Sequence, residues 1–265
     1  MTPPLEVRVQ PFVLSDTREG IATLTLNRGE RYNPLSRDMI GALQAELDRI
    51  ASDTSVRCVV LAANGKGFSA GHDLKELRAH ADKAWQRELF DACARMMLTL
   101  TQLPQPVIAR VHGIATAAGC QLVSMCDLAV AADTATFALP GVNVGVFCTT
   151  PAVGVTRNVA RKRVMEMLLT GEPIDAATAL AWGLVNRVVP PAELDHAVGQ
   201  FTRTIVSRSA RVIATGKRAF YRQIDCGLAE AYDYTGEIMV CSLLEPDAHE
   251  GIDAFLEKRP AKWTG

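Results

Sequence analysis

Residues 58–74, CVVLAANGKGFSAGHDL, and residues 107–122, VIARVHGIATAAGCQL, share one pattern. Each begins with a continuous apolar run, which is typical of a strand buried on both faces. A turn of small residues follows, after which a helix is expected to begin. Small residues let a ligand approach the backbone, and the first amides of a helix have no intrahelical acceptor, so such a turn suits an oxyanion. Taken singly, either turn is explained equally well by close packing.

The chain before and between these two units alternates in the same way. Strand-like runs occur at 21–27 and 56–62, and helical periodicity covers 39–51 and 85–102. Ser36 is a suitable N-cap for the first of these helices. Because strands alternate with helices, the sequence predicts an α/β fold.

The pattern changes near residue 195. A last strand-like run at 185–189 is followed by a mostly helical pattern. Apolar residues in this part need a surface to bury against. We therefore predict a core at 1–195, which holds the site, and a helical C-terminal region at 196–265. The apolar residues in question are Phe220, Leu228, Met239, Leu243 and Phe255.

Composition narrows the class of protein. The 265 residues carry 28 basic and 29 acidic side chains, a net charge of -1, which argues against a nucleic-acid or membrane-surface partner. Seven cysteines are scattered without a C-x-x-C pair, as is common in a reducing compartment. Residues 1–10 contain prolines and a glutamate where a signal peptide needs an apolar run. We expect a cytoplasmic protein without a metal site.

Several motifs accompany the two units in a fixed order, and together they resemble the crotonase superfamily, which includes the enoyl-CoA hydratases and isomerases. The resemblance spans most of the chain, and agreement of independent motifs makes chance a poor explanation. The motifs are Leu26-Asn27-Arg28, Asn33-Pro34-Leu35, Phe68 to Leu74, Pro106 to Ala109 with Gly113, Cys126 to Ala131, Leu169 to Glu172, Ala181 to Val185 and Phe255 to Arg259.

The resemblance implies a ClpP-like spiral of β-β-α turns. Its helical C-terminal region packs into trimers, which are often paired into hexamers. The implied ligand is an acyl-CoA thioester, with coenzyme A as part of the substrate and no further cofactor. Carried over by position, the backbone amides of His72 and Ala118 would polarise the thioester oxygen. Ala118 stands where the family usually has glycine, which narrows the pocket and keeps the amide.

The resemblance also implies contacts to coenzyme A. Residues 69–74 would meet the adenine mainly through backbone groups. The two arginines near the start of the chain are candidates for the phosphates, although exposed basic residues are often only solvated surface. The last motif would reach the ligand of a neighbouring subunit. The candidate residues are Arg28, Arg31, Ser69, Ala70, Asp73, Leu74, Phe255 and Lys258.

The carboxylates of a hydratase are missing. Hydrating an enoyl thioester needs one group to deprotonate water and another to protonate the alpha carbon. Hydratases of the family use two glutamates, whose positions fall at Gln121 and Gly141. A glutamine amide holds water but accepts no proton near neutral pH. No Asp or Glu occurs between Asp133 and Glu166. The segment in which related isomerases carry their catalytic base therefore has no carboxylate either. The chain is most similar to a branch that also lacks both glutamates.

Other side chains near the expected site are candidates for chemistry. The imidazole of His72 titrates near neutrality, but the resemblance assigns a role only to its amide. Cys120 and Cys148 fall near the expected acyl pocket, where a thiolate could form an acyl-enzyme. A buried cysteine is more often a small apolar residue.

Three functions remain open at this point. One is an enzyme that acts on an acyl-CoA by isomerisation, thioester hydrolysis or another route, since conventional 2-enoyl-CoA hydration is not expected. Another is a non-catalytic acyl-CoA binder or partner subunit. A structural or RNA-binding role is the third, which the balanced charge disfavours. Apolar segments at 84–101 and 144–151 predict an apolar acyl tail. Replacing Gln121 and Gly141 together by glutamate is expected to create hydratase activity if the pocket is otherwise intact.

Overall fold

The computed structural model describes residues 10–264. Its larger sheet has six strands in the order β1-β2-β3-β5-β7-β10. β1 pairs antiparallel with β2, and the other neighbouring strands pair parallel. The expected α/β fold is therefore present, and its larger sheet is mostly parallel. The strands are β1 (Val13–Arg18), β2 (Ile21–Leu26), β3 (Cys58–Ala63), β5 (Val107–Val111), β7 (Leu128–Ala132) and β10 (Arg187–Val189).

A second sheet contains four short strands in the order β4-β6-β8-β9. β4, β6 and β8 each follow a strand of the larger sheet, so the chain passes from the large sheet to the small sheet and then into helices. This passage occurs three times, which confirms the expected spiral of β-β-α turns. The strands are β4 (Gly67–Ser69), β6 (Ile114–Thr116), β8 (Thr136–Ala138) and β9 (Ile174–Asp175).

The first helix forms as its sequence predicts. The Ser36 hydroxyl accepts a hydrogen bond from Met39 N at 3.2 Å. The large apolar residues of the helix, Met39, Ile40, Leu43, Leu47 and Ile50, are buried in the core. The helices of the spiral are α1 (Arg37–Ala51), α2 (Leu74–Ala79), α3 (Lys83–Gln102), α4 (Ala118–Met125), α5 (Thr149–Val155), α6 (Arg161–Thr170) and α7 (Ala176–Trp182). Three 3-10 helices, η1 (Gly29–Arg31), η2 (Pro140–Val144) and η3 (Pro191–Glu193), accompany them.

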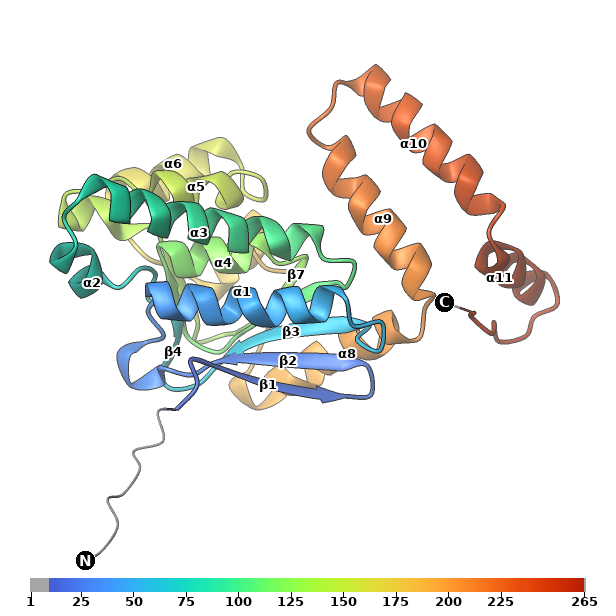
Figure 1. The fold of residues 1–265 in the computed structure, drawn as a ribbon, viewed down its shortest axis with the longest axis horizontal. Helices are drawn as coiled ribbons and strands as arrows, with labels where there is room; N and C mark the ends of the chain where they lie inside the picture. Colours follow the sequence, from blue (N-terminus) through green and yellow to red (C-terminus); the bar gives the residue numbers. More distant parts are fainter. Residues whose placement is uncertain (1–9, 265) are drawn as a thin grey trace, which may run out of the picture.

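The large sheet is buried on both faces. Val59 and Leu61 of β3 belong to the main core, which residues of α1 and α3 also line. Cys58 and Val60 point to the opposite face and join a second apolar cluster with α8 (Leu194–Val206). Figure 1 shows α1 and α3 on one side of the sheet and α8 on the other. Burial on both faces explains why the strand is apolar throughout rather than alternating.

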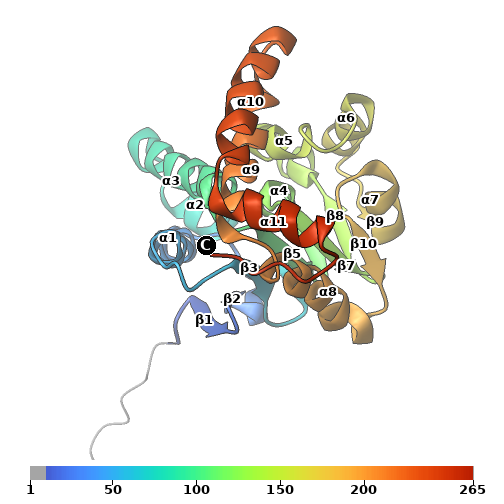
Figure 2. The same ribbon diagram turned by 90° about the vertical axis from the view of Figure 1, so that its right-hand side faces the viewer.

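Three further helices, α9 (Ala210–Gln223), α10 (Leu228–Leu243) and α11 (Pro246–Leu256), complete the chain. They confirm the expected helical C-terminal region. Figure 1 shows α10 and α11 extending away from the spiral, while α9 lies nearer to it, and Figure 2 shows the far end of α10 rising above the spiral. The division proposed between residues 195 and 196 falls in the first turn of α8, which packs on the sheet, and the boundary stays a prediction.

A buried charged network fastens α9 to the spiral. The ammonium group of Lys217 donates hydrogen bonds to Leu100 O at 2.8 Å, Gln105 O at 3.0 Å and Asp127 Oδ2 at 2.6 Å. The Tyr221 hydroxyl donates to Asp127 Oδ1 at 3.0 Å. The Lys217 side chain is only 6% exposed, and burial lowers its pKa although Asp127 opposes the change. The network therefore ties α9 to the end of α3 and the start of β7.

The C-terminal tail folds back on the helices that precede it. The indole Nε1 of Trp263 donates to Ser207 O at 2.8 Å, just before α9 begins. Arg259 donates to both carboxylate oxygens of Glu250, at 2.7 and 3.0 Å, on α11. The chain after α11 is thus held against the C-terminal region at two places.

Three general features of the described residues bear on function. Each of the seven cysteines is a free thiol. Within residues 10–264, no helix combines the length and apolarity needed to cross a membrane. The same residues contain no group of three or more His, Cys, Asp or Glu side chains placed to hold a metal ion.

Candidate functional site

The two glycine-bearing turns lie against each other. β4 and β6 pair in parallel, and the Thr116 hydroxyl donates to Ala70 O at 3.2 Å. Gly71 has a φ of +83°, and a Cβ at this position would lie 2.9 Å from Ala117 Cβ and 3.0 Å from Ala118 N. The peptide that joins Gly71 to His72 therefore runs beside the first amide of α4.

Ala117 holds the chain in an unusual backbone conformation. Its φ is 49° and its ψ is -120°, in a region that non-glycine residues rarely adopt. Its amide donates to Ala138 O at 2.9 Å, which fixes it against the end of β8. Such strain persists where the surroundings impose it, commonly at functional sites. At Ala117 it turns the chain directly from β6 into α4.

The start of α4 packs closely on β4. A Cβ at Gly119 would lie 2.2 Å from Ser69 O, so only glycine fits there. Ala118 N belongs to the first turn of the helix and has no intrahelical acceptor. Within the part of the chain that the structure describes, His72 N likewise donates to no protein acceptor. The structure brings the two predicted segments together; the role of the two amides stays a prediction.

The imidazole of His72 lies against an aromatic ring. Its centroid is 4.9 Å from that of Phe90 on α3. The Nε2 atom is buried and has no hydrogen-bond partner. Burial lowers the pKa of His72 to about 4 because no negative charge offsets the loss of solvation. The ring is therefore neutral at physiological pH.

Acidification is expected to destabilise the wild-type protein relative to a His72→Phe variant. The pKa of His72 falls from 6.5 to about 4 on folding, so the unfolded chain takes up a proton in this range that the folded chain does not. Stability is therefore highest above pH 6.5 and declines as the pH falls to about 4. Thermal unfolding of both proteins at several pH values in this window measures the difference in Tm. A difference that stays constant with pH contradicts the assignment.

Gln121 is buried behind the start of α4. Its side chain is 6% exposed, and Oε1 is buried without a hydrogen-bond partner. A neutral amide cannot remove a proton from water at neutral pH. The chain thus has a polar but non-basic group at the position where the sequence analysis expects the first glutamate of a hydratase.

Gly141 is enclosed by the loop that follows η2. Its carbonyl accepts from Val146 N at 3.0 Å, and its amide donates to Cys148 Sγ at 3.3 Å. A Cβ at Gly141 would lie 2.7 Å from Val146 O and 2.9 Å from Cys148 Sγ. Any side chain there meets backbone, which cannot move without displacing the loop. A glutamate at position 141 therefore requires the loop at 146–148 to move, and the expected effect of glutamates at 121 and 141 stays a prediction.

Both cysteines near this loop carry protonated thiols. Burial raises the pKa of Cys120 to about 12. Burial also raises the pKa of Cys148, although the amide of Gly141 acts in the opposite direction. Because the thiolate is the nucleophile, neither thiol is activated for covalent catalysis at neutral pH. Both fit the expected alternative of small apolar residues in the core.

This arrangement has close relatives among known proteins. A model of the enoyl-CoA hydratase/isomerase family matches residues 16–265. The chain belongs to this family. The expectation that this protein is an enzyme, made from its family resemblance, is therefore confirmed. The reaction that it catalyses is left open.

Individual members of the enoyl-CoA hydratase/isomerase family share nearly the whole chain. An enoyl-CoA hydratase structure from Mycobacterium smegmatis is 51% identical with a TM-score of 0.95, covering 97% of this chain and 100% of that one. Human enoyl-CoA hydratase domain-containing protein 3 is 44% identical with a TM-score of 0.93, covering 96% and 100%. Its Xenopus laevis counterpart is 46% identical over 254 residues, 96% of this chain and 86% of the relative. Enoyl-CoA hydratase domain-containing protein 3 is the branch to which the sequence motifs pointed, and this similarity is confirmed.

The arginines proposed for the phosphates of this family's ligand are engaged within the chain. Arg28 donates to Gln10 O and Pro11 O, and its guanidinium lies 3.8 Å from the centre of the Phe12 ring. Arg31 pairs with Asp73 at 2.7 Å. Both arginines line a pocket of about 240 Å³. A phosphate contact from Arg31 requires it to leave Asp73, and both assignments stay predictions.

The other proposed contacts divide between the spiral and α11. Ser69 is fully buried, and its hydroxyl donates to Asn33 O at 2.9 Å, so it supports the turn. Ala70 and Leu74 are exposed, whereas Asp73 caps α2. Phe255 is 82% exposed, and Lys258 is also exposed. Figure 1 shows α11 at the opposite end of the molecule from α2. Phe255 and Lys258 therefore cannot reach the site of their own chain.

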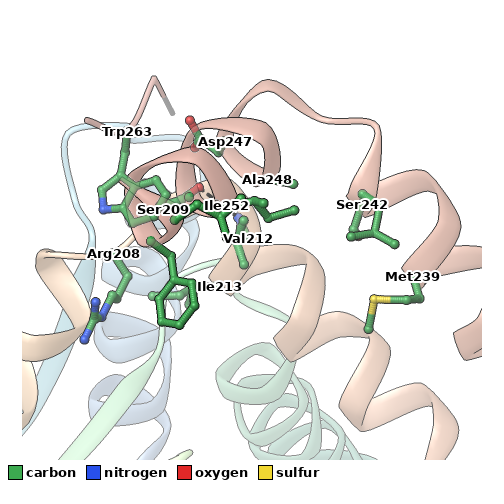
Figure 3. A pocket seen from close by; sticks show the side chains of 14 residues that line it. Arg208, Ser209, Val212, Ile213, Met239, Ser242, Asp247, Ala248, Ile252 and Trp263 are labelled. Atoms are coloured by element: carbon green, nitrogen blue, oxygen red, sulfur yellow. Dashed lines mark hydrogen bonds between the residues drawn. The ribbon is translucent and has the colours of Figure 1, made fainter. Parts of the chain in front are cut away.

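A cavity of about 600 Å³ in the C-terminal region was not expected from the sequence. It lies between α9, α10, α11 and the tail. Figure 3 shows Val212, Ile213 and Ile252 around it, with Trp263 at one side. Helical periodicity identifies such apolar residues one helix at a time. The cavity that they share forms because the C-terminal tail folds back on these helices. No local sequence pattern predicts that return.

Proposed function

We propose that the protein binds an acyl-CoA thioester and polarises its carbonyl oxygen between the backbone amides of His72 and Ala118. The observation that carries this proposal is the position of Gly71, whose Cβ would lie 3.0 Å from Ala118 N. Unpaired amides held by packed backbone stabilise a developing oxyanion without reorganising. Membership of the enoyl-CoA hydratase/isomerase family supports the ligand class.

We propose further that conventional hydration of a 2-enoyl-CoA does not take place. Gln121 supplies no base, and the space beside Gly141 is filled by Val146 and Cys148. Isomerisation or thioester hydrolysis through another group is the remaining catalytic proposal. The lack of space for a carboxylate at Gly141 favours a second candidate function, that of an acyl-CoA binder or partner subunit without turnover.

Replacing Gly71 by alanine is expected to weaken butyryl-CoA binding by at least about tenfold. The added Cβ meets Ala117 and Ala118, and a residue with a side chain is strained at a φ of +83°. Calorimetric titration of both proteins measures the effect. Gly216→Ala on the exposed middle of α9 is the matched control, because a Cβ there meets no atom within 4 Å. Equal affinities for the two variants sink the proposed oxyanion site.

Turnover separates the catalytic proposal from the binding proposal. The wild-type protein is incubated with crotonyl-CoA, 3-enoyl-CoA and saturated acyl-CoAs, and products are followed by mass spectrometry. Isomerised ester or free coenzyme A supports an enzyme, whereas tight binding without a product supports a binder. Hydration of crotonyl-CoA above the buffer rate contradicts the absence of hydratase chemistry.

We propose a homotrimer, alone or paired into a hexamer, as the assembly. Leu228, Tyr232, Leu244, Phe255 and Leu256 are each at least 71% exposed, which leaves a large apolar surface in one chain. Packing α10 and α11 on neighbouring copies would cover it and bring Phe255 and Lys258 to a neighbour's ligand. Analytical ultracentrifugation is expected to give a trimer or hexamer that Leu244→Glu weakens. A monomeric wild type is incompatible with this assembly.

We propose a cytoplasmic location, with coenzyme A carried only as part of the substrate and no metal, nucleic-acid or membrane partner. Free, mostly buried thiols and balanced charge support this setting. The name of the Xenopus laevis relative places that protein in mitochondria. Fluorescent tagging in the source cell tests the location directly.

A further inference from the structure

Asn33 is a fully buried polar residue between β2 and α1, and the proposed function gives it no role so far. Its side-chain Nδ2 donates to Asn64 O at 2.8 Å and to Gly67 O at 3.0 Å. Its Oδ1 accepts from Arg28 N at 2.8 Å. Both polar atoms of the carboxamide are therefore paired with backbone groups, and they join the chain before α1 to the chain on either side of the turn into β4.

The backbone of Asn33 has an unusual conformation. Its φ is 49°, and Tyr32 before it has a φ of 59°. Residues other than glycine rarely adopt positive φ values, and the residue before a proline is ordinarily extended. Such a conformation persists where the surroundings impose it. The side-chain hydrogen bonds of Asn33 supply this constraint and fix the direction in which the chain enters residues 34–35.

The same segment is bonded to the first glycine-bearing turn. The Ser69 hydroxyl donates to Asn33 O at 2.9 Å, and Ala70 N donates to Tyr32 O at 2.8 Å. Gly71 N donates in turn to the Ser69 hydroxyl at 3.3 Å. Residues 69–71 are thus held against residues 32–33 at successive points.

One further hydrogen bond sets the direction of the His72 amide. Leu35 N donates to Gly71 O at 2.8 Å, and Leu35 forms an isolated parallel bridge with His72. The Gly71 carbonyl and the His72 N–H belong to one peptide unit, which is planar and trans, so they point in opposite directions. Because Leu35 holds the carbonyl, the N–H of His72 is turned away from residues 33–35 and cannot rotate while this bond lasts.

We propose that Asn33 is a positioning residue for the oxyanion site. It holds the segment that carries Leu35, and Leu35 fixes the peptide of His72 before a thioester binds. This inference rests on the proposed polarisation of the thioester by His72 and Ala118, and it adds the residue that preorganises one of these two amides. A donor that is fixed in advance stabilises a developing charge without reorganising. Asn33 acts through Leu35 and makes no contact with the ligand itself.

Two ligands that differ only at the carbonyl test this role. The wild-type protein is titrated calorimetrically with butyryl-CoA and with S-butyl-CoA, a thioether that has a methylene group in place of the carbonyl. Butyryl-CoA is expected to bind about tenfold more tightly, the effect of one or two additional hydrogen bonds. The ratio of the two dissociation constants is the readout, since general damage to the protein weakens both ligands alike.

Two variants remove the contacts of Asn33. Asn33→Gly deletes the side-chain hydrogen bonds, and glycine tolerates a φ of 49°. Ser69→Ala deletes the hydroxyl that bonds Asn33 O and accepts from Gly71 N. In each variant the preference for butyryl-CoA is expected to fall below about threefold, because the His72 amide is no longer fixed. S-butyl-CoA is expected to bind as it does to the wild type.

Gln105→Ala is the matched control. Gln105 is only 6% exposed, and its Nε2 donates to two backbone carbonyls, those of Ile50 at 3.0 Å and Asp53 at 3.3 Å. This variant therefore also loses a buried carboxamide that joins separate segments, but at the end of α1. Its preference for butyryl-CoA is expected to match that of the wild type.

The bound carbonyl reports its own polarisation. Infrared difference spectra are recorded with butyryl-CoA that carries ¹³C at the thioester carbonyl. The carbonyl stretch is expected to move to lower frequency on binding to the wild type and to Gln105→Ala. With Asn33→Gly it is expected to return toward the frequency of the free ligand. A residue that contributed only to stability would leave this frequency unchanged.

The outcomes are distinct. Loss of the preference in Asn33→Gly and Ser69→Ala, but not in Gln105→Ala, supports the positioning role. A wild-type preference that both variants retain overturns this inference and leaves the proposed function standing. Equal binding of the two ligands by the wild type overturns it together with the proposed polarisation. Failure of both ligands to bind removes the proposed function, and this inference falls with it. If Asn33→Gly does not fold, Ser69→Ala decides, because it breaks the same contact from the side of the turn.

Discussion

Lys217→Met is expected to lower the free energy of unfolding by about 3–5 kcal/mol, the usual cost of removing one partner of a buried ion pair. The ammonium group is only 6% exposed and holds Asp127 together with two backbone carbonyls, those of Leu100 and Gln105. Without it, the Asp127 carboxylate keeps, among residues 10–264, only Val107 N and the Tyr221 hydroxyl as hydrogen-bond donors. For a chain of this size the loss corresponds to a fall in Tm of roughly 10 °C.

A surface pair supplies the matched control for Lys217. Arg211 and Glu245 form an ion pair between α9 and the start of α11, with Arg211 62% exposed. Arg211→Met is expected to cost less than about 1 kcal/mol, because exposed pairs contribute little. Thermal unfolding is measured at one protein concentration, since association also changes Tm. A Lys217→Met protein that melts with the wild type contradicts the anchoring role.

A Lys217→Met, Asp127→Asn protein refines the same prediction. Removing both charges relieves the penalty of a carboxylate left without its cation. The double variant is therefore expected to recover part of the stability lost by Lys217→Met. A double variant that is less stable by the sum of the two single effects indicates independent roles for the two residues.

A Gln121→Glu, Gly141→Glu protein is expected to lose about 3 kcal/mol or more of stability and to show no hydration of crotonyl-CoA. The clash at position 141 is with the backbone of Val146 and Cys148, and overpacking against fixed backbone is costly. A carboxylate forced into this enclosed place also loses its hydration. Tm and the absorbance change of crotonyl-CoA measure the two effects.

A single replacement at position 141 separates the effect of added side-chain volume from the effect of added charge. Gly141→Ala is expected to destabilise the protein through the added Cβ alone. Gly41→Ala in the exposed part of α1 is the control, and it is expected to stabilise by about 0.5–1 kcal/mol because a Cβ there meets nothing within 4 Å. If the double glutamate variant folds normally and hydrates crotonyl-CoA, the prediction is contradicted. The loop at 146–148 then moves aside at little cost in stability.

Local signals account for what the sequence predicted well. Ser36 caps its helix through an interaction within four residues, and the apolar run at Cys58 to Leu61 describes a strand buried on both faces. The two glycine-bearing turns were found for the same reason. Their contact was expected only from the family resemblance, because the residues that meet lie about 45 positions apart in the chain.

Features that depend on distant packing were missed. β4, β6 and β8 have three residues each, which is too short for alternation to be visible, so the sequence indicated only turns. Gly141 was expected to mark the missing second glutamate, which stays a prediction; the close contacts around it are set by the loop at 146–148 and have no local signal in the sequence. The pairing of Lys217 with Asp127 joins residues 90 positions apart and leaves no periodic trace.

The return of the C-terminal tail determines how the C-terminal helices unfold. A terminal helix ordinarily frays from its free end. Here Trp263 closes a ring of chain at Ser207, and Arg259 fastens the tail to Glu250 inside that ring. α11 therefore has no loose end from which to unwind, and α9, α10 and α11 are expected to unfold together as a single cooperative unit.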